Sequence, residues 1–117
     1  MYPERLLDHF RNPRNVGELP PPAVTVEAAN PACGDILRLS VRFERGVAAE
    51  ARYKVRGCTG SIAAGSALTE WIVGKTREEI ARFQPSEIEA ALGGLPPASK
   101  HAAGLCAEAV RLMVSIP

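Results

Sequence analysis

Two cysteines and an aspartate in the first half of this 117-residue chain carry side chains suited to binding a metal ion. Cys33 and Asp35 are separated by Gly34, and side chains at positions i and i+2 of an extended segment point in the same direction. A thiolate and a carboxylate placed in this way can face one ion, while the glycine leaves the backbone free to turn. The alternative is a turn with a buried cysteine, because free cysteine is among the most buried residue types.

Cys58 lies in the segment RGCTGS, between Gly57 and Gly60. We expect it at the junction between a strand and a helix, where the free N–H groups and partial positive charge of a helix N-terminus favour a thiolate. Thr59 and Ser61 carry hydroxyls that can cap the helix or donate a hydrogen bond to a bound sulfur. The alternative is a structural residue at a turn.

His101 and Cys106 lie near the C-terminus, within the first turns of an expected helix. A lone histidine is more often a surface residue or a hydrogen-bonded core residue than a metal ligand. Cys106 follows Ala102 by one helical turn, about 5.4 Å, whereas a metal–sulfur bond is only about 2.3 Å long. Two roles therefore stay open for Cys106: a small core residue of an amphipathic helix, or a metal ligand that approaches the site.

Three strands that position these residues are predicted from the alternation of apolar and polar side chains. The three segments are 23–30, 36–44 and 47–57. Residues 44–46 form a tight connection, so the second and third strands should pair as a hairpin. Each of these two strands has one apolar and one polar face, which predicts a sheet that is covered on one side only. In the third strand the residues predicted to face inward are Val47, Ala49, Ala51, Tyr53 and Val55.

Helical periodicity is found on both sides of the strand region. The predicted helical segments are 3–10, 59–73, 76–83, 85–92 and about 98–115. Thr76 and Glu79 match a capping box at the start of the third of these segments. The order of elements predicts an α+β fold, in which helices pack on one face of a three-stranded antiparallel sheet. The length predicts a single domain over residues 1–117.

Composition and charge exclude several classes of function. The chain is 46% apolar and 23% charged, with a net charge of +1, as in ordinary soluble globular proteins. Its mixed charges lack the basic stripe of a nucleic-acid binder, and its apolar stretches are shorter than the about 20 residues that span a membrane. Three widely spaced cysteines and an N-terminus without an apolar leader segment predict a reducing, cytoplasmic location.

Four sequence blocks, found in one order, resemble the U-type iron–sulfur cluster scaffold family, which includes IscU, SufU and the N-terminal domain of NifU. The blocks are MYPERLLDHFRNPRNVGEL, NPACGD, GCTGSIAAGSALTEWIVGK, and LPP followed by KH. The resemblance covers nearly the whole chain. It implies the α+β sandwich of the NifU and IscU proteins.

The resemblance also implies a metal site and a function. In the family, three cysteines and an aspartate hold a nascent [2Fe–2S] cluster or a Zn²⁺ ion, and the histidine after L-P-P can be a further ligand. Carried over by position, the matching residues here are Cys33, Asp35, Cys58 and His101. The implied function is that of a scaffold or carrier, not a turnover enzyme, which receives sulfur from a cysteine desulfurase and passes the cluster to apo-proteins.

The chain departs from the family pattern at two places. Ala102 stands where the family has its third cysteine, a usual sulfur acceptor, which argues against ordinary persulfide acceptance. Ala98 and Ser99 replace the valine and lysine that a DnaK-type chaperone reads in many members, which argues against that interaction. Two alternative functions stay open. One is zinc-dependent sulfur transfer with Cys58 or Cys33 as the persulfide acceptor, and the other is that of a degenerate paralogue acting as an interaction module.

Overall fold

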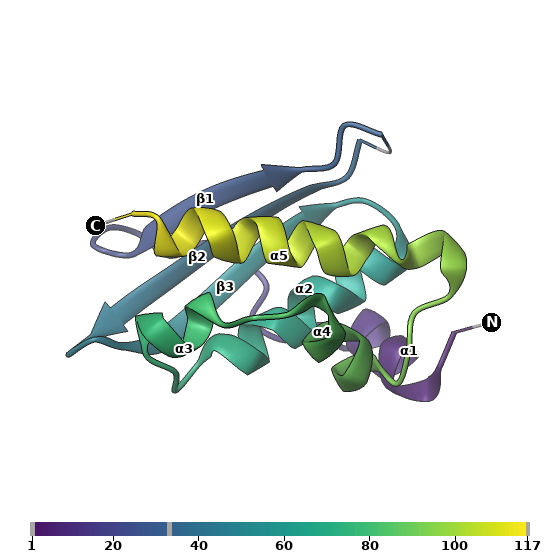
Figure 1. Cartoon of the computed structure of the whole chain (residues 1–117), viewed down its shortest axis with the longest axis horizontal. Helices are drawn as coiled ribbons and strands as arrows, with labels where there is room; N and C mark the ends of the chain where they lie inside the picture. Colours follow the sequence, from purple (N-terminus) through teal and green to yellow (C-terminus); the bar gives the residue numbers. More distant parts are fainter. Residues whose placement is uncertain (1, 33, 117) are drawn as a thin grey trace.

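The computed structural model describes residues 2–32 and 34–116, whose elements follow the predicted order (Figure 1). The strands are β1 (Val24–Ala29), β2 (Ile36–Glu44) and β3 (Val47–Arg56). The helices are α1 (Glu4–Arg11), α2 (Thr59–Ile72), α3 (Arg77–Ala81), α4 (Pro85–Leu92), the 3₁₀ helix η1 (Pro97–Ser99) and α5 (His101–Val114). Within the described ranges, no helix has the length and apolar character needed to cross a lipid bilayer.

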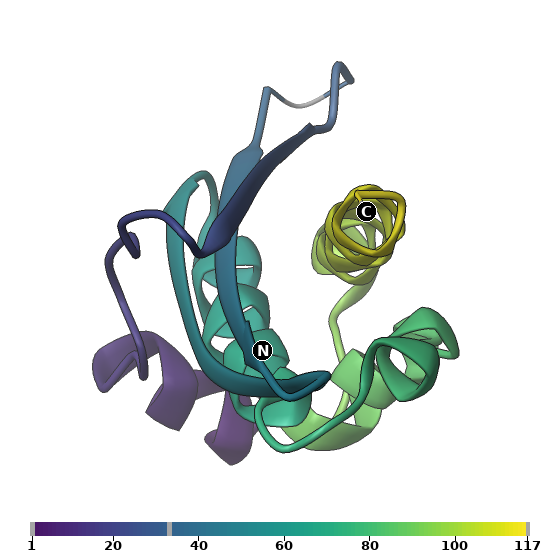
Figure 2. The same ribbon diagram turned by 90° about the vertical axis from the view of Figure 1, so that its left-hand side faces the viewer.

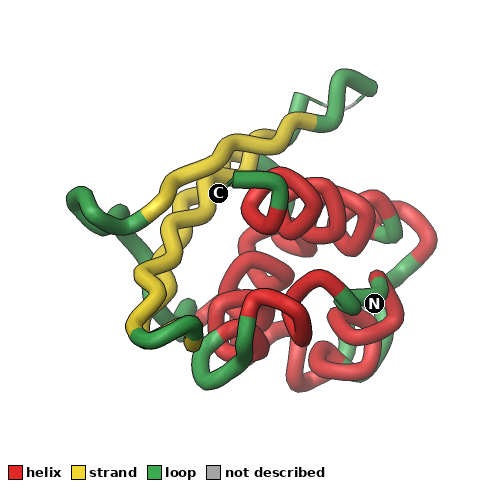
Figure 3. The backbone as a smooth tube through the Cα atoms, turned by 60° about the vertical axis from the view of Figure 1, so that its left-hand side comes forward, coloured by secondary structure: helices red, strands yellow, loops and turns green. Residues whose placement is uncertain are grey.

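The three strands form one antiparallel sheet in the order β1-β2-β3. Arg45 and Gly46 make the turn between β2 and β3, with φ angles of 54° and 79°. This left-handed backbone matches the twist of a two-residue hairpin. The helices lie on one side of the sheet, as Figure 3 shows for the red helices and yellow strands and Figure 2 shows from another direction. The predicted fold class is therefore confirmed.

The inward face predicted for β3 is wrong near the start of the strand. Ala48 is buried and Ala49 is exposed, whereas strict alternation predicts the reverse. The pairing shifts between Arg42, which lies opposite Glu50, and Phe43, which lies opposite Ala48. Ala49 is thus the extra residue of a β-bulge. A bulge adds one residue to one strand and so reverses the phase of the alternation beyond it.

Helix α2 packs very closely on β3 because its residues are small. A Cβ atom at Gly65 would overlap the ring of Tyr53, so only a glycine fits there without displacing the ring. The Tyr53 hydroxyl donates a hydrogen bond to the Ile62 carbonyl at 2.8 Å. Helix α5 contacts β1, β2 and α2. These contacts fix the N-termini of α2 and α5 relative to the sheet.

Helices α3 and α4 pack on α5 and lie beside it (Figure 2), and α4 also contacts α1 and α2. The predicted capping box of α3 is confirmed: the Glu79 N–H donates to Thr76 Oγ1 at 3.2 Å, and the Thr76 N–H donates to the Glu79 carboxylate at 2.9 Å. The last predicted helix begins later than expected. Its first turn is the tighter helix η1, and α5 itself begins at His101.

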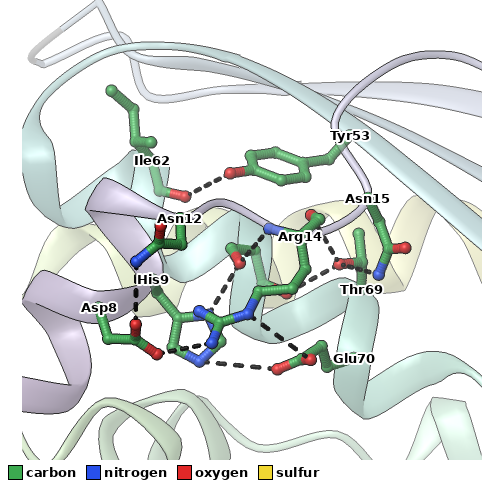
Figure 4. Close-up of polar contacts among 10 residues, drawn as sticks. Asp8, His9, Asn12, Arg14, Asn15, Tyr53, Ile62, Thr69 and Glu70 are labelled. Carbon is green, nitrogen blue, oxygen red and sulfur yellow. Dashed lines mark hydrogen bonds and ion pairs between the residues drawn. The ribbon is translucent and has the colours of Figure 1, made fainter.

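The segment after α1 is an ordered loop that hydrogen bonds fix to α2 (Figure 4) and to β3. Ser66 Oγ accepts the Arg14 N–H at 2.9 Å and lies 2.8 Å from Nδ1 of His9. The Asn15 side-chain amide donates to Thr69 Oγ1 at 3.1 Å. In addition, the Asn15 carbonyl accepts the N–H of Tyr53, which extends the edge of the sheet. The N-terminal segment is therefore part of the packed structure.

His9 makes the stability of this N-terminal packing depend on pH. Burial, together with the nearby Arg14 cation, lowers the pKa of His9 below its ordinary value of 6.5. As the pH falls below 6.5, His9 becomes protonated in the unfolded chain more readily than in the folded protein. The free energy of unfolding should therefore fall. We expect denaturant unfolding to give a lower free energy at about pH 5.5 than at about pH 7.5. His9→Asn should reduce this difference, and an unchanged difference would rule out His9 as its source.

Candidate metal site

Three segments that are far apart in the sequence meet at one end of the sheet, on the right in Figure 1. Asp35 directly precedes β2, Cys58 is the N-cap residue of α2, and His101 is the first residue of α5. One potential ligand atom from each residue lies within 4.8 Å of the other two. The structure therefore brings together three of the residues singled out in the sequence.

The distances among these atoms suit a single cation. Nε2 of His101 lies 3.1 Å from Oδ2 of Asp35 and 3.7 Å from Sγ of Cys58. Nitrogen and sulfur ligands of one tetrahedral zinc ion lie about 3.5 Å apart, given bonds of about 2.0 Å and 2.3 Å. Sulfur, nitrogen and oxygen are also donor types found in zinc and iron–sulfur sites. The three side chains thus need only small movements to bind one ion.

The backbone of Cys58 is extended, with φ −78° and ψ 171°, and its side chain makes no capping hydrogen bond to α2. The sulfur therefore lies beside the helix N-terminus but does not accept a capping hydrogen bond from it. The partial positive charge of this 14-residue helix stabilises negative charge at that end. Cys58 is half-buried, as is His101, so both side chains can be reached from the solvent.

Asp35 is only 7% exposed, and its carboxylate is held by neighbours from the segment around Cys58. The Ser61 hydroxyl donates a hydrogen bond to Oδ2 of Asp35 at 2.6 Å. Gly57 also packs against this carboxylate, and a Cβ atom there would lie 2.6 Å from the carboxyl carbon. The glycine before Cys58 is therefore required for the position of Asp35.

Among the described residues, the group of potential ligand atoms contains Asp35, Cys58 and His101 but not Cys106. Its side chain is 1% exposed and belongs to the hydrophobic core. Burial raises the pKa of the Cys106 thiol to about 12, so the thiol stays protonated at neutral pH. Ala102, one turn earlier, is also fully buried. Cys33, the remaining ligand expected from the sequence, lies outside the described residues.

Two features of the site are not visible in the sequence pattern. The hydroxyl of Ser61, for which the sequence suggests a cap or a contact to bound sulfur, donates to Asp35 instead. Ser99 is 3% exposed and packs against Gly60, where a Cβ atom would lie 2.7 Å from that of Ser99. Both contacts join residues that are distant in the chain, so no local signal could have predicted them.

Sequence comparisons connect this arrangement to known proteins. The family model described as the NifU-like N terminal domain matches residues 1–116. The iron–sulfur cluster assembly scaffold protein IscU of Azotobacter vinelandii is 38% identical over 117 residues, covering 97% of this chain and 91% of that protein. IscU of Haemophilus influenzae is 36% identical over 118 residues, covering 97% of this chain and 93% of that protein.

Solved structures show the same fold. A SufU protein from Fervidobacterium islandicum AW-1 superimposes with a TM-score of 0.77 at 20% identity, covering 97% of this chain and 96% of that one. The N-terminal part of a NifU-like protein from Brucella abortus gives a TM-score of 0.67 at 17% identity, covering 97% and 94% of the two chains. Sequence and fold lead to one conclusion: this chain belongs to the NifU-like N-terminal domain family of U-type scaffold proteins.

Proposed function

We propose that this protein is a scaffold for iron–sulfur cluster assembly, which binds a nascent cluster, or the iron for it, as its cargo. The ligands in this proposal are Cys33, Asp35, Cys58 and His101. The observation that carries it is the convergence of the last three at one end of the sheet, with their donor atoms within 4.8 Å of one another. The scaffold function of the IscU relatives, which match the chain over nearly its full length, supports it.

The donor set suits a cargo that must be released again. Thiolates bind zinc and iron–sulfur clusters firmly, and a carboxylate or an imidazole completes four ligands while making release easier than from four thiolates. In this proposal a cysteine desulfurase supplies the sulfur, and apo-proteins receive the finished cluster. A DnaK-type chaperone is not part of the proposal, because Ser99 is buried where the chaperone-binding pattern has lysine.

Zinc-dependent sulfur transfer is a second candidate function, favoured by one observation. The distances of 3.1 Å and 3.7 Å from His101 to Asp35 and to Cys58 are close to those between two ligands of one mononuclear ion. In this alternative, zinc holds the site and Cys58 or Cys33 accepts persulfide sulfur.

Anaerobic reconstitution tests both functions. The purified chain is incubated with ferrous iron, cysteine, a cysteine desulfurase and dithiothreitol, the reductant that converts persulfide sulfur to sulfide, and its visible spectrum and bound metal are measured. Sulfide-to-iron charge-transfer bands, followed by transfer of iron and sulfide to an apo-ferredoxin, are the results expected of a scaffold. Stoichiometric zinc without colour would favour sulfur transfer. Absence of bound metal, with a melting temperature that does not respond to chelator, would contradict both.

A further inference from the structure

We propose that Ser61 is a positioning residue of the metal site: its hydroxyl holds Oδ2 of Asp35 toward Cys58 and His101, and so sets the affinity for the cation. This inference rests on the proposed metal-binding function. It assigns a role to a side chain that supplies no ligand atom itself.

The hydrogen-bond geometry assigns the Ser61 proton to Asp35. Ser61 Oγ lies 2.6 Å from Oδ2 of Asp35 but 3.5 Å from Sγ of Cys58. A hydroxyl carries one proton, and the short contact is to the stronger acceptor, a carboxylate. Toward Cys58 the Ser61 oxygen can therefore only accept a hydrogen bond. Ser61 holds the carboxylate, and it does not hold the sulfur by donation.

The Asp35 oxygen that Ser61 holds is the one that faces His101. Oδ2 of Asp35 also lies 3.1 Å from Nε2 of His101. A carboxylate oxygen has two lone-pair directions, so Oδ2 can accept the Ser61 hydrogen bond and bind a cation at the same time. Ser61 is 2% exposed and belongs to the first turn of α2, so its hydroxyl is itself held firmly.

Loss of the hydroxyl should weaken metal binding without removing a ligand. Asp35 would lose a hydrogen bond that fixes the rotation of its carboxylate, and the buried oxygen would lose a donor. Removing an outer-shell partner of a metal ligand typically lowers metal affinity by about 10–100-fold. A change in that range is expected for Ser61→Ala.

Ser66 provides a matched control on the same helix. It is also buried, at 0% exposure, but its hydroxyl contacts His9 and the Arg14 backbone and not the metal site. Ser66→Ala should lower the melting temperature and leave metal affinity unchanged. Ser61→Thr, which keeps a hydroxyl, should retain most of the wild-type affinity.

The experiment titrates the metal-free full chain with Zn²⁺ alone, in competition with a chromophoric chelator, and with Co²⁺, whose visible bands report sulfur coordination. Ser61→Ala is expected to bind zinc about 10–100-fold more weakly than the wild type. The decisive step is a double-mutant cycle: in an Asp35→Ala background, Ser61→Ala should have no further effect. Circular dichroism establishes that each variant is folded, which is expected because alanine favours helix.

Distinct outcomes would overturn the inference and the proposed function. If the wild type binds zinc and cobalt but Ser61→Ala binds them equally well, Ser61 does not position the ligand. An equal loss with and without Asp35 would likewise overturn the inference, because the effect would not pass through that carboxylate. Wild-type protein that binds neither metal nor cluster would instead overturn the proposed function, and the inference with it.

Discussion

Cys58→Ala is expected to abolish stable metal binding, whereas Cys106→Ala should leave it unchanged, although each variant removes one thiol. Cys58 Sγ lies 3.7 Å from Nε2 of His101, within the group of three potential ligand atoms. The Cys106 thiol is in the core and protonated, with a pKa raised to about 12 by burial. Loss of a ligand should lower zinc affinity by more than about 100-fold, the upper range for an outer-shell partner. Chelator competition and metal analysis of the two variants measure this.

The stability of the same two variants should change in the opposite order. Cys106 is 1% exposed, so its truncation leaves a small cavity and should lower the free energy of unfolding by about 1 kcal/mol. Cys58 is half-buried, and in the metal-free protein its truncation should cost less. Denaturant unfolding in the presence of chelator makes the comparison. Loss of metal binding in Cys106→Ala, with Cys58→Ala unaffected, would mean that Cys106 is the ligand.

Gly57→Ala is expected to weaken metal binding by about 100-fold, although Gly57 has no ligand atom. The added Cβ would lie 2.6 Å from the carboxyl carbon and 2.7 Å from Oδ2 of Asp35, closer than real Cβ atoms approach a neighbour. The carboxylate must therefore move, and with it the ligand oxygen. The overlap should also lower the free energy of unfolding by about 1–3 kcal/mol, as overpacking usually does. Zinc titration and denaturant unfolding of the metal-free variant measure the two effects.

Gly104→Ala is the matched control for this prediction. Gly104 lies in the first turn of α5, close in sequence to His101, but a Cβ atom there would have no neighbour within 4 Å. Alanine should therefore raise the free energy of unfolding by about 0.5–1 kcal/mol through its helix preference and leave metal affinity unchanged. Wild-type zinc affinity in Gly57→Ala would show that Asp35 binds no metal or that its position tolerates the added methyl group.

The sequence alone predicts most of the local structure because local structure depends on local patterns. Alternating apolar residues predict β2 and most of β3, the Thr76–Glu79 box predicts the start of α3, and the change of period after Cys58 predicts the start of α2. The bulge at Ala49 could not be predicted, since the alternation along one strand does not show where that strand has one residue more than its partner. The resemblance to a known family, carried by four blocks, predicts the overall fold.

For the candidate metal site, too, some features follow from the sequence and others only from the tertiary structure. The sequence by itself determined which side chains are suited to metal chemistry, and that Cys58 lies where a strand gives way to a helix. Only the tertiary structure decided that Asp35, Cys58 and His101 meet, that Ser61 donates to Asp35, and that Cys106 is buried in the core. The reason is physical. These distances depend on how α2 and α5 pack against the sheet, and that packing is set by contacts between residues far apart in the chain.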